Sequence, residues 1–169
     1  MAVTLDPALP DDVAAQAERV LDLACARNVL LATAESCTGG LLAALLTDVP
    51  GKSHVFERGF VVYSSRAKCD LLDINRDKVE TCGAVSRAVA VDMACGALKA
   101  SGAQLALAIT GFAGPGAEDD EEGLVHFACA VDGRPTDHRE AHFGAIGRQG
   151  VRLAALRVAL DMMERALAQ

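Results

Sequence analysis

Two short apolar segments, residues 28–34 (NVLLATA) and 103–110 (AQLALAIT), constrain the fold of this chain more than any other feature. Neither segment contains a charged residue, and each ends close to a glycine-rich turn. Strands that are apolar on both faces are typical of parallel sheets covered by helices on two sides. The pattern therefore predicts two central strands of a sheet that helices sandwich.

The remaining segments supply those helices and the edges of the sheet. Helical periodicity indicates helices over residues 11–27, 39–47, 65–73, from the Ser86 cap to about Lys99, and 147–168. A Val/Phe-rich strand is expected over residues 55–63, and strands over 123–131 and 136–143 flank the hairpin signal Asp132-Gly133. The order predicts an α/β fold, a three-layer α/β/α sandwich with a mixed β-sheet. We expect one domain over residues 1–169, with an N-terminal tail over 1–10.

Composition and charge limit the kinds of partner that this chain is expected to bind. The net charge of −7 is concentrated in the run Glu118–Glu122, so the rest of the chain is nearly neutral and presents no basic footprint for nucleic acid. No apolar stretch is long enough to span a membrane, and no signal peptide is visible, which favours the cytoplasm. The 51% of hydrophobic residues suggests an exposed patch and a homo-oligomer, most simply a dimer.

Cysteine and histidine patterns give no sign of a metal site. The six cysteines form no CxxC pair, and the four histidines form no HExxH motif. We expect reduced and mostly buried cysteines and no structural metal ion.

The two central strands end in turns of the same kind. The first turn is Glu35-Ser36-Cys37-Thr38-Gly39-Gly40, and the second begins Thr110-Gly111-Phe112 and continues to Gly116. Ligands of open α/β sheets bind outside the carboxyl ends of strands, and glycines allow the backbone to approach them. Amides at a helix start can also bind an anion or an oxyanion. The alternative is that Gly39 and Gly40 only permit a tight turn.

Ser36 is a candidate nucleophile, although a serine before a helix is equally a cap. A serine needs a base, and no histidine lies in a nearby motif. Tyr63 and Lys68, at the end of the next strand and in the helix after it, are the candidates for that base. A lysine acts as a base only where burial or a neighbouring cation lowers its pKa, whereas most lysines are solvated.

Other residues near these turns have both a catalytic and a structural interpretation. Cys37 could be a thiolate nucleophile or a small buried residue, and Glu35 a general base or a residue that holds the loop. Arg148 and Arg152 could clamp a phosphate or carboxylate, or be solvated arginines of a helix face. The acidic run 118–122 is most simply a mobile, solvated loop.

Four segments together resemble the CinA C-terminal domain family, the nicotinamide-nucleotide amidohydrolases or NMN deamidases. They are TAESCTGG at 33–40, VVYSSRAK at 61–68, GAVS at 83–86 and AITGFAGPG at 108–116. Their order and spacing match, and the resemblance covers residues 15–165. It implies an α/β/α sandwich that hydrolyses the carboxamide of nicotinamide mononucleotide, without metal or organic cofactor, in pyridine nucleotide recycling.

The resemblance also implies roles for individual residues. Ser36 would be the nucleophile, and Lys68 and Tyr63 would activate it and pass its proton to the leaving ammonia. The implied substrate-binding residues are Glu35, Thr38, Gly39, Gly40, Thr110, Gly111 and either Arg148 or Arg152.

This chain departs from the family pattern after GPG, where AEDDEE replaces a stretch resembling Thr-Pro-x-Lys-Pro. Five carboxylates there would weaken the binding of an anionic phosphate. Many relatives also carry an N-terminal domain resembling molybdopterin-binding proteins, whose activity does not transfer to these residues. The alternatives are a serine hydrolase for another amide and a non-catalytic nucleotide-binding or competence- and damage-linked interaction domain.

Overall fold

The computed structural model describes residues 9–169, so the first eight residues of the predicted tail lie outside the described part. One mixed sheet of five strands, in the order β2-β1-β3-β4-β5, forms the middle layer. Strands β1 (Leu31–Glu35), β2 (Phe56–Val61) and β3 (Leu105–Gly111) run parallel. Strands β4 (Leu124–Val131) and β5 (Asp137–His142) extend the sheet in antiparallel pairing. The mixed α/β sheet agrees with the predicted fold class.

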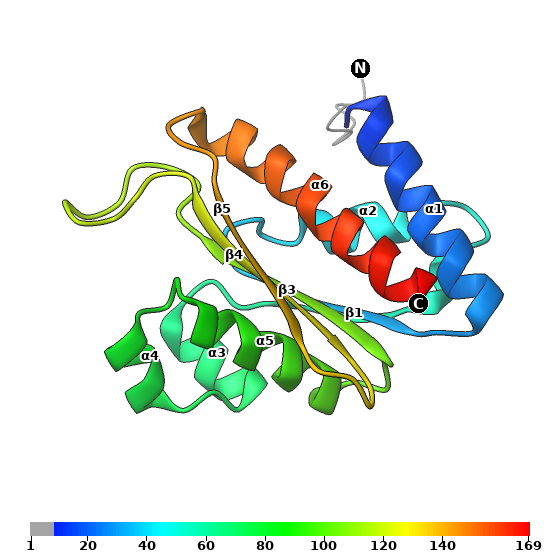
Figure 1. The fold of residues 1–169 in the computed structure, drawn as a ribbon, viewed down its shortest axis with the longest axis horizontal. Helices are drawn as coiled ribbons and strands as arrows, with labels where there is room; N and C mark the ends of the chain where they lie inside the picture. Colours follow the sequence, from blue (N-terminus) through cyan, green and yellow to red (C-terminus); the bar gives the residue numbers. More distant parts are fainter. Residues whose placement is uncertain (1–8) are drawn as a thin grey trace, which may run out of the picture.

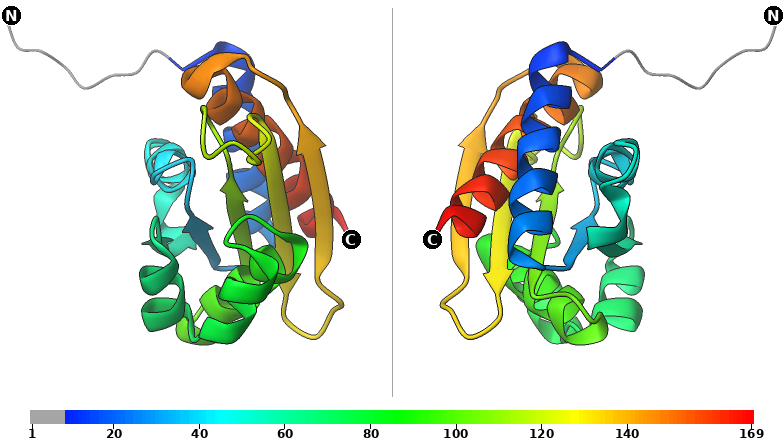
Figure 2. Two further views of the ribbon diagram at one scale, coloured as in Figure 1. Left: turned by 90° about the vertical axis from the view of Figure 1, so that its left-hand side faces the viewer. Right: turned by 90° about the vertical axis from the view of Figure 1, so that its right-hand side faces the viewer.

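Helices cover both faces of this sheet (Figure 1). Helices α1 (Asp11–Arg27), α2 (Leu41–Thr47) and α6 (Gly147–Ala168) pack on one face. Helices α3 (Ser65–Leu72), α4 (Arg76–Cys82) and α5 (Arg87–Ala100) lie on the other. The two side views in Figure 2 show the strands side by side, with α1 and α6 behind the sheet in the left view and in front of it in the right view. The molecule is therefore a three-layer α/β/α sandwich.

The alternation of side chains along β3 explains how one strand contributes to the hydrophobic cores on both faces of the sheet. Leu105, Leu107 and Ile109 face the layer of α1 and α6, whereas Ala106 and Ala108 face α5. Successive side chains of a strand point to opposite faces, so an unbroken apolar run fills both interiors. Alanines on the α5 side let that helix lie close to the strand.

The predicted elements are present with small differences at their ends. The expected strand 28–34 begins only at Leu31, because Asn28 adopts a left-handed conformation and its amide closes the end of α1. Helix α4 and the short 3₁₀ helix η1 (Ser53–Val55) were not predicted. In α4 only Val79 is buried, so no apolar stripe marks it, although the capping residue Asn75 is a usable signal.

The cysteines correct one expectation. Only Cys37 and Cys129 are buried, whereas Cys82 and Cys95 are exposed, so the cysteines are not mostly buried. All six are free thiols. Among residues 9–169, no helix has both the length and the apolar character needed to cross a membrane.

Candidate active site

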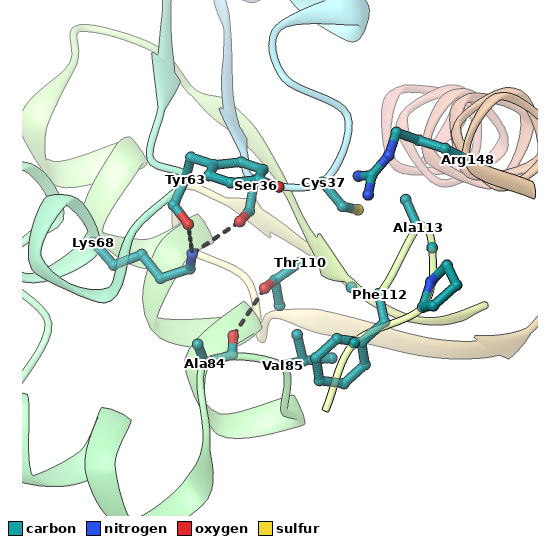
Figure 3. Close-up of a pocket in the computed structure, with 14 residues that line it drawn as sticks. Ser36, Cys37, Tyr63, Lys68, Ala84, Val85, Thr110, Phe112, Ala113 and Arg148 are labelled. Carbon is teal, nitrogen blue, oxygen red and sulfur yellow. Dashed lines mark hydrogen bonds between the residues drawn. The ribbon is translucent and has the colours of Figure 1, made fainter. Parts of the chain in front are cut away.

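A cavity of about 280 Å³ opens at the carboxyl ends of β1 and β3, where the sequence places its two glycine-rich turns. Ser36 and Cys37 from the first turn and residues 110–116 from the second line it. Tyr63 and Lys68, Ala84 and Val85, and Arg148 complete the wall (Figure 3). The fold thus brings five separated segments of the chain to one pocket.

Ser36 and Lys68 are in direct contact within this pocket. The Lys68 Nζ atom lies 2.9 Å from Ser36 Oγ, a contact drawn in Figure 3. The same atom donates a second hydrogen bond, 2.8 Å long, to the Val62 carbonyl. Lys68 is 1% exposed and Ser36 7% exposed. Helix α2 begins at Leu41 with Gly40 as its cap, so Ser36 is not a capping residue. The serine hydroxyl has a nitrogen base as its partner instead.

Burial of Lys68 lowers the pKa of its amine from the usual range to about 8. The loss of hydration disfavours the charged form, and no carboxylate makes a salt bridge to Lys68 in the described part of the chain. A substantial fraction of the amine is therefore neutral near physiological pH. A neutral amine beside a serine hydroxyl can accept its proton.

Tyr63 reaches the pocket from its rim. Its side chain is 64% exposed, and the contact it makes with Lys68 is through the backbone carbonyl, 3.5 Å from Nζ. Within residues 9–169 the Tyr63 hydroxyl has no hydrogen-bond partner. The phenol ring of Tyr63 therefore lies on the solvent side of the Ser36–Lys68 pair. Of Tyr63 and Lys68, only Lys68 contacts the Ser36 hydroxyl.

Glu35 lies behind the first turn and does not line the cavity. Its side chain is fully buried and its carboxylate accepts hydrogen bonds from the Thr38 hydroxyl and from three amides, those of Gly40, Leu42 and Ala43. Glu35, Thr38 and Gly40, which we expected to bind a substrate, thus lie outside the lining of the cavity in this structure. The amides of Gly40, Leu42 and Ala43 donate to Glu35, so they are not free to bind an anion at the start of α2.

Gly39 and Gly40 are both left-handed, with φ of 62° and 99°, a conformation that glycine adopts without strain. Arg152 approaches the same turn from α6 and donates from Nε to the Cys37 carbonyl at 2.8 Å. A Cβ atom on Gly39 would lie 3.6 Å from an Nη atom of Arg152. These three residues shape the turn and, like Thr38, do not line the cavity.

Arg148 and Thr110 face the cavity, as does Gly111. Arg148, in the first turn of α6, makes no ion pair with any residue of the described range, and a Cβ atom on Gly114 would lie 3.1 Å from its Nη2 atom. The Thr110 hydroxyl donates to the Ala84 carbonyl at 2.8 Å. The structure thus separates the two arginines, with Arg148 at the pocket and Arg152 supporting the turn.

Cys37 is a poor alternative nucleophile. It is 3% exposed, and burial raises the pKa of its thiol to about 11. The thiol remains protonated at neutral pH, and only the thiolate is strongly nucleophilic. Of the adjacent pair Ser36 and Cys37, only the serine contacts a base.

The acidic run 118–122 is a loop between β3 and β4, and two of its carboxylates have partners. Asp120 accepts from the Ala117 amide, and Glu121 pairs with His142 at 2.6 Å. The run is mostly exposed, but these contacts tie it to its own loop and to β5, so it is not simply a solvated segment. Among residues 9–169, no group of three His, Cys, Asp or Glu side chains could hold a metal ion.

We did not predict that Ala84 and Val85 line the pocket, or that the Val62 carbonyl accepts a hydrogen bond from Lys68. Residues 84 and 85 belong to the GAVS segment, so the motif itself was an available signal. No sequence signal identifies a backbone carbonyl as the partner of a lysine.

The comparisons with known proteins place the chain among proteins of one family. The family model described as the CinA C-terminal domain matches residues 13–167. A CinA-like protein of Chlorobium phaeobacteroides is 51% identical over 116 residues, which are 68% of this chain and 28% of that protein. The chain spans between 26% and 35% of the length of the first four curated relatives. The nicotinamide-nucleotide amidohydrolase PncC of Escherichia coli K12 is 44% identical over 82% of this chain and 84% of its own length.

Solved structures show the same fold. The competence/damage inducible protein CihA from Agrobacterium tumefaciens superposes with a TM-score of 0.92 at 43% identity, covering 97% of this chain and all of that one. A competence damage-inducible protein A from Klebsiella pneumoniae gives 0.87 at 34% identity, covering 93% and 98%. With a family model that matches nearly the full length and relatives at these identities, the chain belongs to the CinA C-terminal domain family.

Proposed function

We propose that this protein is a serine amidohydrolase that converts nicotinamide mononucleotide to nicotinic acid mononucleotide and ammonia, in the recycling of pyridine nucleotides. The 2.9 Å contact between Ser36 Oγ and the buried Lys68 amine carries the proposal. The name of the Escherichia coli relative, similar over 82% of the chain, supports the choice of substrate.

The reaction would proceed in two steps. Ser36 Oγ attacks the carboxamide carbon while its proton passes to the neutral Lys68 amine, and the tetrahedral intermediate expels ammonia with the proton that Lys68 returns. Water then attacks the resulting ester with Lys68 again as the base, releasing the acid and restoring the serine. Splitting the hydrolysis of a poor electrophile into two steps lowers the larger barrier.

Two neighbours of Lys68 favour its role as a base. The Val62 and Tyr63 carbonyls lie 2.8 and 3.5 Å from Nζ and can each accept one hydrogen from a neutral amine. The lone pair is then free to face Ser36. Tyr63, on the rim, is proposed to help carry the proton to the leaving group.

Arg148 is proposed to bind the phosphate of the substrate. It lines the pocket and has no carboxylate partner in the described residues. A guanidinium matches a phosphate with paired hydrogen bonds. The main chain of the second turn, whose residues 110–116 line the pocket, would hold the rest of the nucleotide.

The test is to incubate the purified protein with nicotinamide mononucleotide, nicotinamide riboside and nicotinamide, and to measure ammonia and the acid product. We expect equal amounts of ammonia and nicotinic acid mononucleotide from the nucleotide and much slower release from the two compounds without phosphate. Ammonia from another amide alone would indicate a serine hydrolase of different specificity. No hydrolysis by the folded protein would favour a non-catalytic binding domain.

The expected dimer stays a prediction. Among residues 9–169, four large hydrophobic side chains are exposed, namely Val61, Tyr63, Leu71 and Ile146. Burial of such side chains is a common driving force for association. Light scattering of the purified protein at several concentrations would measure the mass in solution.

A further inference from the structure

The turn that carries Ser36 is built around a buried carboxylate for which the proposed reaction has no chemical use. Glu35 is fully buried, and its carboxylate accepts four hydrogen bonds from neutral donors. No residue of the described range forms a salt bridge with it. A buried carboxylate is costly unless its oxygens are hydrogen-bonded, so these four contacts are needed to hold the charge there.

The four donors lie on both sides of the turn. The Thr38 hydroxyl, 2.6 Å away, and the Gly40 amide lie in the turn, whereas the amides of Leu42 and Ala43 belong to the start of α2. A carboxylate carries only acceptors, so it alone can satisfy four donors at once. Glu35 therefore joins the end of β1 to the turn and the turn to the helix.

The backbone around Ser36 is fixed at the same time. The Ser36 amide donates to the Ile109 carbonyl at 3.0 Å, and the Glu35 carbonyl accepts from the Val62 amide at 2.8 Å. Glu35 thus also bonds through its backbone to Val62, and the carbonyl of Val62 accepts a hydrogen bond from Lys68. A shift of Glu35 would change the distance between Ser36 and Lys68.

The contacts leave two amides without partners. The Cys37 and Thr38 amides, which directly follow Ser36, have no hydrogen-bond partner within residues 9–169. Acyl transfer requires donors for the oxyanion, and backbone amides next to the nucleophile are a common source. The amides of α2 cannot serve, because Glu35 holds Gly40, Leu42 and Ala43.

We propose that Glu35 is a positioning residue, whose buried carboxylate holds turn 36–40 so that Ser36 meets Lys68 and the amide of Cys37, which lines the cavity, stays free for the oxyanion. This inference rests on the proposed serine chemistry. Glu35 acts through the turn and contacts no reacting atom. Its loss would therefore slow the chemical step more than it weakens substrate binding.

The test compares Glu35→Gln, Thr38→Val and Thr38→Ser with the surface control Glu80→Gln. For each variant, kcat and KM are measured on nicotinamide mononucleotide, and the rate and final extent of Ser36 labelling by a fluorophosphonate are followed by intact mass. In Glu35→Gln an amide nitrogen faces donors that need an acceptor. We expect kcat and the labelling rate to fall at least tenfold, with KM within twofold and labelling still reaching completion.

The threonine variants keep the test valid if Glu35→Gln does not fold. Thr38→Val removes one of the four donors and is expected to lower kcat and labelling in the same direction by a smaller factor. Thr38→Ser retains the hydroxyl and should be faster than Thr38→Val. If Glu35→Gln has the same kcat per labelled site as the wild type, Glu35 is only a structural residue and the inference is overturned. Where Glu35→Gln does not fold, the same result in Thr38→Val overturns the inference.

The labelling arm separates this inference from the proposed function. If wild-type Ser36 is labelled but nicotinamide mononucleotide is not hydrolysed, the proposed substrate is wrong and the labelling rates of the variants still decide the role of Glu35. If wild-type Ser36 is neither labelled nor needed for turnover, the serine chemistry and the inference both fail.

Discussion

The turn after β1 and the turn after β3 share a sequence pattern, in which hydroxyl residues and glycines follow an apolar strand, yet they differ in structure. In the first, Ser36, Cys37 and Thr38 are nearly inaccessible, and Glu35 and Arg152 hold it from behind. The second begins buried at Thr110, becomes exposed at Pro115 and Gly116, and continues into the mostly exposed acidic run 118–122, and Figure 1 shows this loop extending beyond the sheet. The first turn carries the proposed nucleophile, and the second forms part of the cavity wall.

The difference has a physical basis. A nucleophile is effective only when its position relative to its base is fixed to within a fraction of an ångström. This requires a turn with few alternative conformations. An entrance must admit and release the substrate, and exposed loops with few contacts allow this. Changes in the first turn should therefore alter kcat, and changes in the second should alter KM or loop dynamics.

The largest effect is expected at the base itself. Lys68→Met keeps a long buried side chain but removes the nitrogen that contacts Ser36. We expect kcat/KM to fall on the order of a thousandfold or more, as for other catalytic groups that act as a unit. The exposed Lys99→Met is the control. Retained activity in a folded Lys68→Met protein would remove Lys68 from the reaction.

The pH dependence should reflect the same amine. Burial lowers the pKa of Lys68 to about 8, so its basic form increases as pH rises toward that value. We expect kcat/KM to rise about tenfold per pH unit below pH 8 and to level off above it. Because unfolded Lys68 would keep its proton to higher pH, this group also makes folding more favourable as pH rises above 8. A rate that is constant from pH 6 to 8 would contradict a titrating base.

The two arginines of α6 test the comparison between turns directly. Arg152 holds the Cys37 carbonyl, whereas Arg148 lines the pocket beside Gly114. A hydrogen bond from a charged group is worth about 1.5–3 kcal/mol, so we expect Arg152→Ala to lower kcat roughly tenfold or more. Arg148→Ala should instead raise KM by a similar factor with kcat nearly unchanged. Identical effects of both variants on KM would show that Arg152 also binds substrate.

The smallest effect is expected where the acidic loop that follows the second turn contacts β5. Hydrogen bonds to Glu121 and Glu140 raise the pKa of His142, so the charged pair persists to higher pH than it would with an ordinary histidine and weakens as pH rises through that pKa. His142→Gln should leave kcat within about twofold and increase amide exchange over residues 117–122. In the wild type the corrected exchange of the same amides should increase with pH, and a pH-independent value would argue against this contact.

The sequence predicts the sandwich because its signals are periodic and strong. The unbroken apolar runs at 28–34 and 103–110 and the hairpin at Asp132-Gly133 are all found as expected. Helix α4 is missed because a short helix with one buried side chain has no apolar periodicity. The ends of elements also shift, as at Asn28, where local backbone conformation decides the boundary.

The candidate site is only partly accessible from sequence. Ser36, Lys68 and Thr110 lie at one pocket, as the strand-to-turn pattern and the family resemblance predict. The sequence left Arg148 and Arg152 as alternatives, and in the structure Arg148 is the one that lines the pocket. The place of Glu35 and Arg152 behind the turn is not predictable, because burial and hydrogen-bond direction depend on the packing of α2 and α6. The same holds for the Val62 carbonyl that orients Lys68.

The central claim is that a serine on the buried turn carries out amide hydrolysis, and Ser36→Ala tests it most directly. Ammonia release from nicotinamide mononucleotide is measured for the wild type and for Ser36→Ala side by side, with thermal melting to show that the variant is folded. The account predicts release by the wild type and none above background by the variant. Equal release by both proteins would contradict it, because the pocket would then hydrolyse the amide without its serine.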